Sequence, residues 1–299
     1  MRQRQLIEAD LLTDMKMQKR RIMMMKMKKW MILVASLLLF FTGCAQMSSN
    51  TASSPASPVI DRVLQRGELV VGMAGNMPPL NMTTKEGELI GYEVDLANAM
   101  ANAMGVKPRL QVIPFAELLP ALQSGKIDLI LSNMTITPRR NLKVAFVGPY
   151  FNSGKAFLTK IKTIAQADEA AKIDAKNTKL VALKGSTSQA FVAEAIPNAT
   201  LITANDYDEA VKMVLEDKVD AMVADYPICV VSVFRYPDKG LLSVVTKLTY
   251  EPIGVGLPAG DPLLVNWMEN FMGIAEKTGL LQELRGKWFQ KTDWLQKLP

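Results

Sequence analysis

Histidine is absent from this chain of 299 residues, and cysteine occurs only twice, as Cys44 and Cys229. Nucleophiles that depend on a neighbouring histidine therefore cannot be built, and a zinc site would lack its usual ligands. We accordingly expect no catalytic residue, no metal and no cofactor. Cys229 lies in an apolar run, so we expect it to be a buried free thiol.

An excess of positive charge is absent from most of the chain. The formal net charge is +6, but residues 1–43 hold nine Lys or Arg and three Asp or Glu. From Cys44 onward, 26 residues of each sign remain. Because this part of the chain is formally neutral, its charge gives no reason to expect a nucleic acid partner.

The one long apolar run near the N-terminus covers residues 30–41. It is too short for a membrane span, which needs about 20 residues, and a stretch rich in Lys and Arg precedes it, as in a secretory signal. The run ends in Phe41-Thr42-Gly43-Cys44, which resembles a bacterial lipobox, although Phe41 stands where an aliphatic residue is usual. We therefore predict a lipoprotein signal peptide at residues 1–43 and lipidation of Cys44.

The segment around this signal leaves two alternatives open. Six methionines between residues 15 and 27 precede the apolar run, so translation can also begin inside the sequence. An uncleaved N-terminal anchor is the alternative to lipidation, and it would leave the protein on the same membrane face. Residues 44–58 are rich in Ser, Thr, Ala and Pro, which predicts a flexible tether to a folded body that begins near Val59.

From residue 68 onward, strand and helix patterns alternate twice in the same order. The first half predicts strands at 68–72, 109–113 and 127–131, with helices at 93–104 and 116–124. The second predicts strands at 180–183, 200–203 and 219–223, with helices at 188–196 and 208–215. Such alternation indicates an α/β protein with a mostly parallel sheet and flanking helices in each half. Two amphipathic helices, at 261–278 and 280–289, end the chain.

Two short segments of these halves correspond position by position, at 125–133 and 217–225. Asn133 and Asp225 each follow equivalent strands, and open α/β sheets bind ligands beyond the carboxyl ends of their strands. From Ser132 onward, hydroxyl and amide side chains lead to Arg139 and Arg140, a composition suited to a small carboxylate. We therefore expect both segments to line a shared cleft. The alternative is that Asn133 and Asp225 only cap the next helix or turn.

Several motifs carry a resemblance to a known family. They are GYEVDLA at 91–97, LPALQSGK at 119–126, MTITPRR at 134–140, GPY at 148–150, GST at 185–187 and DYP at 225–227. From about Leu69 to Trp294, the chain resembles the periplasmic solute-binding proteins of the polar amino acid class, which serve ATP-binding-cassette importers. The resemblance implies a two-lobed periplasmic-binding-protein fold, in which two hinge crossovers join the lobes.

The implied division of the chain follows the Gly- and Pro-rich segments between the halves. Lobe 1 comprises residues 59–151 with 255–299, and lobe 2 comprises residues 155–248. Residues 152–154 and 249–254 form the hinges, where a change of backbone dihedrals moves the lobes.

The resemblance also implies roles for polar residues of the site. Arg140 matches the arginine that holds the ligand α-carboxylate, a task for which its planar fork is suited. Thr135 and Asn133 match groups that add donors, and Thr187 matches the carboxylate contact of lobe 2. Asp225 matches the acceptor of the ligand ammonium group.

The expected side-chain pocket departs from the family pattern. Phe115 matches an aromatic residue that lies against the ligand side chain, although a core position is the alternative. Where many members have an acidic residue, an aromatic residue and Phe, this chain has Ala74, Met77 and Leu80. The missing acidic group argues against a cationic ligand, so we expect a neutral amino acid.

The expected function is that of a monomeric, lipid-anchored receptor on the periplasmic or extracellular face of the membrane. It would close its lobes on a free amino acid and deliver the ligand to the permease of an ABC importer. One alternative is a secreted enzyme that resembles cyclohexadienyl or arogenate dehydratase on the same fold. Another is a solute-binding protein that serves a sensory receptor.

Overall fold

The computed structural model describes residues 20, 23, 24, 57–243 and 248–299. The predicted signal peptide, Cys44 and nearly all of the predicted tether lie outside these residues, apart from the three isolated positions and the Ser57-Pro58 pair. Within the described part, no helix combines the length and the apolar character that crossing a membrane requires. Cys229 is a buried free cysteine, as predicted.

The first of two five-stranded sheets has the order β5-β1-β6-β13-β7. In it, β1 (Glu68–Met73) pairs in parallel with β5 (Lys107–Val112) and with β6 (Leu129–Ile130). The neighbouring β13 (Glu251–Pro258) runs antiparallel to both β6 and β7 (Val144–Ser153). The sheet is therefore mostly parallel, with β13 as the reversed strand.

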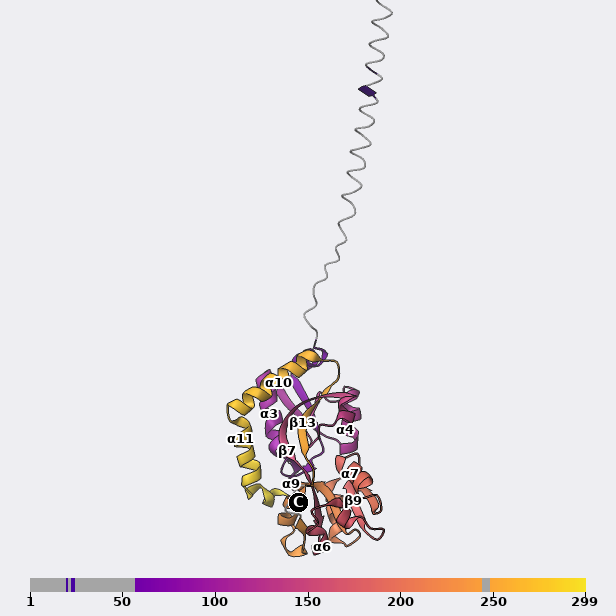
Figure 1. Ribbon diagram of the computed structural model, residues 1–299. Helices are drawn as coiled ribbons and strands as arrows, with labels where there is room; N and C mark the ends of the chain where they lie inside the picture. Colours follow the sequence, from indigo (N-terminus) through magenta and orange to yellow (C-terminus); the bar gives the residue numbers. More distant parts are fainter. Residues whose placement is uncertain (1–19, 21–22, 25–56, 244–247) are drawn as a thin grey trace, which may run out of the picture. The chain divides into compact units, whose positions relative to one another are not determined.

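Helices cover both faces of this sheet because successive side chains of β1 point in opposite directions. Val70 belongs to the same apolar cluster as the buried side chains of α4 (Phe115–Gln123). Leu69 and Val71 belong instead to the cluster that holds α3 (Tyr92–Met104) and α10 (Pro262–Lys277). Figure 1 shows α3 and α10 on one side of β7 and β13, and α4 on the other.

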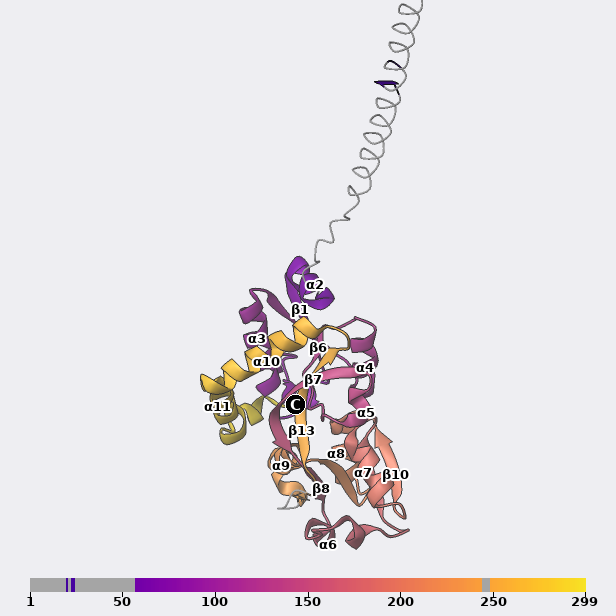
Figure 2. The ribbon, with the colours of Figure 1, turned by 45° about the horizontal axis from the view of Figure 1, so that its top comes forward.

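The second sheet repeats this plan in the order β10-β9-β11-β8-β12. Its parallel strands are β9 (Lys179–Leu183), β10 (Thr200–Ala204) and β11 (Ala221–Asp225). The reversed strand β8 (Lys155–Thr159) lies between β11 and β12 (Leu242–Ser243). Its helices are α7 (Thr187–Ala195), α8 (Tyr207–Leu215) and α9 (Tyr226–Arg235), and Figure 2 shows this group apart from α3, α10 and β1.

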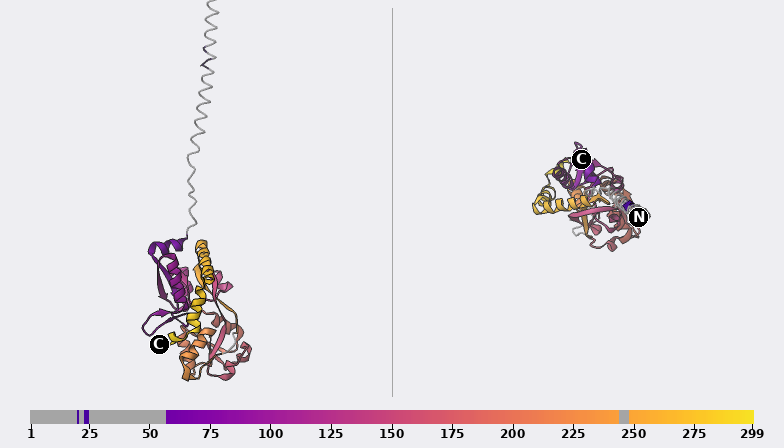
Figure 3. Two further views of the ribbon diagram at one scale, coloured as in Figure 1. Left: turned by 90° about the vertical axis from the view of Figure 1, so that its left-hand side faces the viewer. Right: turned by 90° about the horizontal axis from the view of Figure 1, so that it is seen from above.

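The remaining elements are short. A three-stranded sheet contains β2 (Asn76–Met77), β3 (Asn81–Thr83) and β4 (Leu89–Ile90). The further α-helices are α2 (Pro58–Arg66), α5 (Pro138–Asn141), α6 (Lys162–Ala165) and α11 (Leu280–Arg285). A π-helical segment at Gly286–Gln290 follows α11, and 3₁₀ turns occupy Ala170–Ile173, Pro237–Lys239 and Asp293–Lys297. The C-terminus, marked in Figure 3, lies beside α9, where Arg235 Nη2 donates to the Pro299 carbonyl oxygen at 2.8 Å.

The chain passes between the two sheets twice, which gives the predicted two-lobed fold. The first passage is at Gly154, between β7 and β8, and the second ends where β13 begins at Glu251. Both passages fall in the Gly- and Pro-rich segments that the sequence indicates as crossovers. The exact lobe and hinge limits given above stay a prediction.

Candidate functional site

Asn133 and Asp225 meet at the carboxyl ends of β6 and β11, on the two different sheets. Asn133 Nδ2 donates to Asp225 Oδ2 at 2.5 Å, and each residue is 3% exposed. Asp225 occupies the N-cap position of α9, but its carboxylate makes no capping bond. The capping alternative is therefore wrong for Asp225, whose carboxylate accepts instead from the Asn133 and Lys155 side chains. Asn133 has a positive φ of 48°, a conformation that asparagine tolerates better than most residues.

Lys155 is a buried partner of Asp225 that the sequence analysis missed. Its side chain is 1% exposed, and its Nζ atom lies 2.9 Å from Asp225 Oδ1 and 3.4 Å from Glu251 Oε2. The antiparallel register of β8 and β11 places Lys155 opposite Asp225, which explains the contact. The available signal was a lone cationic residue at the head of the apolar run Ala156–Leu158.

A chain of hydroxyl groups connects Glu251 to the predicted carboxylate contacts. Thr187 Oγ1 donates to Glu251 Oε2 at 3.0 Å, and Thr249 Oγ1 donates to Glu251 Oε1 at the same distance. Thr135 Oγ1 lies 3.3 Å from Thr187 Oγ1, so hydroxyls of the two lobes touch. Burial acts to raise the pKa of Glu251, but the Lys155 ammonium and the threonine hydroxyls outweigh it and hold this pKa below its ordinary value.

Arg140 extends from α5 toward both lobes. The hydroxyl of Thr137 caps this helix by accepting from the Arg140 N–H at 3.1 Å. Arg140 Nη1 donates to the Thr135 carbonyl oxygen at 2.8 Å, and Arg140 Nη2 donates to the Gly185 carbonyl oxygen at 3.1 Å. Because a guanidinium has five N–H groups, donors remain for a carboxylate. The neighbouring Arg139 is exposed to solvent.

The charge on Arg140 is partly desolvated. Burial lowers the pKa of this side chain to about 10, although Asp225 and Glu251 act in the opposite direction. A half-buried cation such as Arg140 gains more from a bound carboxylate than a fully exposed one does, because water screens its charge less.

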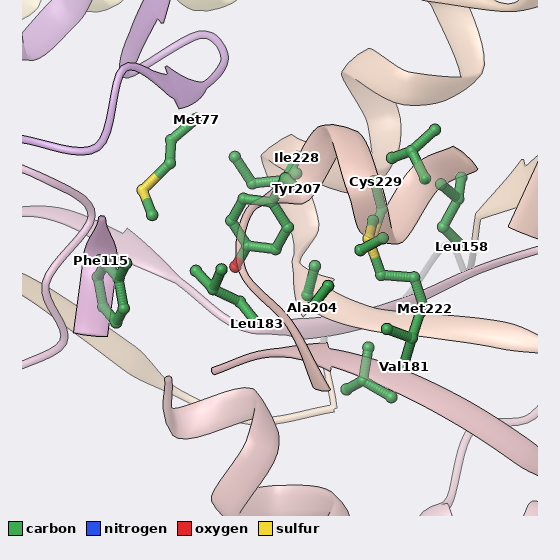
Figure 4. Packing of buried hydrophobic residues seen from close by; sticks show 14 of the residues in the cluster. Met77, Phe115, Leu158, Val181, Leu183, Ala204, Tyr207, Met222, Ile228 and Cys229 are labelled. Atoms are coloured by element: carbon green, nitrogen blue, oxygen red, sulfur yellow. The ribbon is translucent and has the colours of Figure 1, made fainter. Parts of the chain in front are cut away.

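The predicted side-chain pocket is assembled in part. The Arg140 guanidinium carbon lies 5.7 Å from the centre of the Phe115 ring. Phe115, Met77 and Ala74 belong to one buried cluster, together with Tyr207 at the start of α8. Figure 4 shows the side chains of Met77 and Phe115 beside those of Tyr207 and Leu183. Leu80, by contrast, belongs to the other apolar cluster, so the structure does not group it with these residues.

Glu93 holds the backbone of Asn133 by a hydrogen bond, and the sequence analysis also missed it as a site residue. Its Oε1 accepts the Asn133 N–H at 2.6 Å, and its carboxyl group also accepts from Asn81 Nδ2 and from the Tyr150 hydroxyl. Glu93 is fully buried, and this desolvation raises its pKa. Its place in the GYEVDLA motif was a signal that sequence reasoning did not use.

Together these residues form a compact polar centre between the sheets, with two cations, Arg140 and Lys155, and two anions, Asp225 and Glu251. Asn133 Oδ1 is buried and has no hydrogen-bond partner among the described residues, so it can accept from a ligand. No cluster of three or more potential metal ligands occurs within the described ranges. The arrangement suits a small ligand that carries both charges.

The sequence pattern of the bacterial extracellular solute-binding proteins, family 3, matches residues 69–291. An L-arginine-binding protein of Pseudomonas aeruginosa is 31% identical over 228 residues, which cover 73% of this chain and 86% of the relative. A cyclohexadienyl dehydratase of the same species is 22% identical over 249 residues, which cover 83% of this chain and 92% of the relative.

Solved structures of amino acid-binding proteins share the fold. The ancestral amino acid-binding protein AncCDT-1, a precursor of cyclohexadienyl dehydratase, is 33% identical with a TM-score of 0.70, and the match covers 77% of this chain and 99% of that one. An ancestral arginine-binding protein bound to glutamine is 31% identical with a TM-score of 0.71, and the match covers 76% of this chain and 99% of that one. These similarities confirm the resemblance that the sequence motifs predict.

Proposed function

We propose that this chain, which belongs to family 3 of the bacterial extracellular solute-binding proteins, captures a free neutral amino acid and delivers it to an ABC importer. The relatives described above are mostly amino acid-binding proteins, and the polar centre between the sheets has the charges that such a ligand requires. Lobe closure around the ligand would give the form that a permease recognises.

The observation that carries this proposal is that one cation and one anion from different lobes, Arg140 and Asp225, border the same polar centre. Arg140, which follows β6, offers donors for an α-carboxylate, with the hydroxyls of Thr135 and Thr187 beside it. Asp225, at the end of β11, offers a carboxylate for an ammonium group, and the unpartnered Oδ1 of Asn133 adds a second acceptor. A zwitterion contributes both groups, since its carboxylate would accept from Arg140 and its ammonium group would donate to Asp225 and Asn133, whereas a ligand without an ammonium group leaves the buried Asn133 Oδ1 unpaired.

The side chain of the ligand would face Phe115, Met77 and Ala74, which are buried and carry no charge. Leu80 contributes through the core of the first lobe. An aromatic ring and a flexible thioether suit an uncharged side chain of irregular shape. This composition supports a neutral rather than a cationic amino acid.

The proposed location is the outer face of the membrane, where lipidated Cys44 and the tether to residue 58 would hold a monomeric receptor. The apolar run at residues 30–41 and the lipobox-like sequence support this part of the proposal. A sensory role would use the same binding site with a different membrane partner.

Calorimetric titration with the twenty standard amino acids tests the proposal directly. We expect at least one neutral amino acid to bind, and Asp225→Ala to weaken that binding by about 2 to 5 kcal/mol, because truncation removes the ammonium acceptor and leaves Lys155 with one carboxylate fewer. A wild-type chain that binds none of the twenty, or a folded variant that binds within threefold of it, would contradict the proposal.

A dehydratase-like enzyme is the second candidate, and one observation favours it. Because the Lys155 ammonium already pairs with Asp225, the carboxylate does not depend on an amine from the ligand. Incubation with prephenate and with arogenate distinguishes the two candidates. Turnover of prephenate or arogenate with loss of the ring carboxylate supports the enzyme. No turnover of either compound at high protein concentration supports the receptor.

A further inference from the structure

We infer that Lys155 is a specificity-determining residue, which sets the charge class of the ligand by holding the site at zero net charge. This inference rests on the function proposed above. Lys155 is the first residue of β8 and is 1% exposed. Its register opposite Asp225 directs the ammonium group at the carboxylate that is proposed to receive the ligand.

The main chain around Lys155 fixes this position. Its N–H donates to Thr249 Oγ1 at 3.0 Å, and its carbonyl oxygen accepts from the Leu248 N–H at 2.9 Å. The side chain bridges two carboxylates, at 2.9 Å to Asp225 and 3.4 Å to Glu251. Because an unpaired ammonium group is costly to bury, these two carboxylates hold the lysine in the site.

The charges of the site then balance. Lys155 and Arg140 contribute two positive charges, and Asp225 and Glu251 contribute two negative charges. A neutral amino acid is a zwitterion and keeps this balance. Lysine or arginine as the ligand adds a positive charge, and glutamate or aspartate adds a negative charge, in a place where water screens little.

Without Lys155, the same site would hold one negative charge in excess. It would then suit a ligand with one additional positive charge. Glu93 lies behind the Asn133 backbone and does not contact any of the four charged groups. Glu93 is kept in all variants below, so each single substitution removes one charged side chain from the same starting site.

Calorimetric titration of the full chain with all twenty amino acids tests the inference. For Lys155→Met, we expect the affinity for lysine and arginine, relative to the best neutral amino acid, to rise about 10- to 100-fold. For Glu251→Gln, we expect a relative gain of similar size for glutamate and aspartate. The double variant, which lacks both charges, is the matched control and should return to a neutral preference.

The outcomes separate this inference from the proposed function. A wild-type chain that binds no amino acid overturns the proposed function, and the inference with it. A wild-type chain that binds a neutral amino acid, with relative affinities unchanged within threefold in both single variants, overturns the inference alone. Thermal melts establish that each variant is folded. If Lys155→Met does not fold, Glu251→Gln alone tests the inference, by whether its relative affinity for glutamate and aspartate rises.

Discussion

Residues 125–133 and 217–225 begin alike and end differently. Gly125 and Asp217 both have positive φ, at 72° and 56°. Asp128 Oδ2 accepts the Val70 N–H at 2.8 Å, and Asp220 Oδ2 accepts the Lys179 N–H at 2.7 Å. Each aspartate therefore ties the central strand of its sheet to the first strand of the same half.

The two segments diverge past their strands. After β6, the chain turns through Asn133 and continues to Arg140, so the first lobe contributes a cation. After β11, α9 begins at Tyr226, so the second lobe contributes the carboxylate of Asp225 directly at the strand end. The comparison teaches that the repeated part builds equivalent scaffolds, and that the different continuations supply Arg140 and Asp225, two of the four charged groups of the site.

Removal of the cation in the first lobe should have the largest effect on this comparison. We expect Arg140→Ala to weaken amino acid binding by about 2 to 5 kcal/mol, because a desolvated carboxylate would lose its charged partner. Arg139→Ala is the matched control, since that side chain is exposed and is expected to leave binding unchanged. Titration calorimetry measures both, and equal losses in the two variants would remove the distinction between the neighbouring arginines.

The equivalent aspartates allow a sharper test of the shared scaffold. Asp128 is 1% exposed and also pairs with Arg62 Nη2 at 2.8 Å and with Arg66, whereas Asp220 is half-buried. We expect Asp128→Ala to lower the free energy of unfolding by about 2 to 4 kcal/mol, and Asp220→Ala by about 1 kcal/mol. Chemical denaturation checks both values. Equal losses of unfolding free energy in the two variants would show that the deeper burial of Asp128 adds no stability over that of Asp220.

The smallest expected effect concerns the link between the two lobes through Glu251. Its folded pKa lies below the ordinary value, so its ionised form stabilises the fold, and this contribution is complete above the unfolded pKa of about 4.3. It is lost as the pH falls through the lower folded pKa. We expect the free energy of unfolding of wild type to exceed that of Glu251→Gln by about 1 to 2 kcal/mol at pH 7. This difference should shrink below about pH 4. Thermal melts from pH 7 to pH 3 measure this difference, and a constant offset would mean that ionisation of Glu251 contributes nothing.

Strand and helix periodicity accounted for most of the elements around the site. The predicted strand and helix ranges of both halves agree with the structure to within a few residues, because apolar faces are encoded locally. The long pair β7 and β13 was not predicted, since the Gly- and Pro-rich ends of these strands have the composition of loops. The final predicted helix, 280–289, proved to be α11 followed by a π-helical segment.

The sequence by itself determined the two repeated halves, the family and the positions of Asn133 and Asp225 at equivalent strand ends. These follow from local patterns and from strand order. Only the tertiary structure decided that Lys155 pairs with Asp225 and Glu251, and that Leu80 and Phe115 belong to different apolar clusters. The physical reason is that Lys155 and Asp225 are 70 residues apart, and only the antiparallel register of β8 and β11 brings their side chains together.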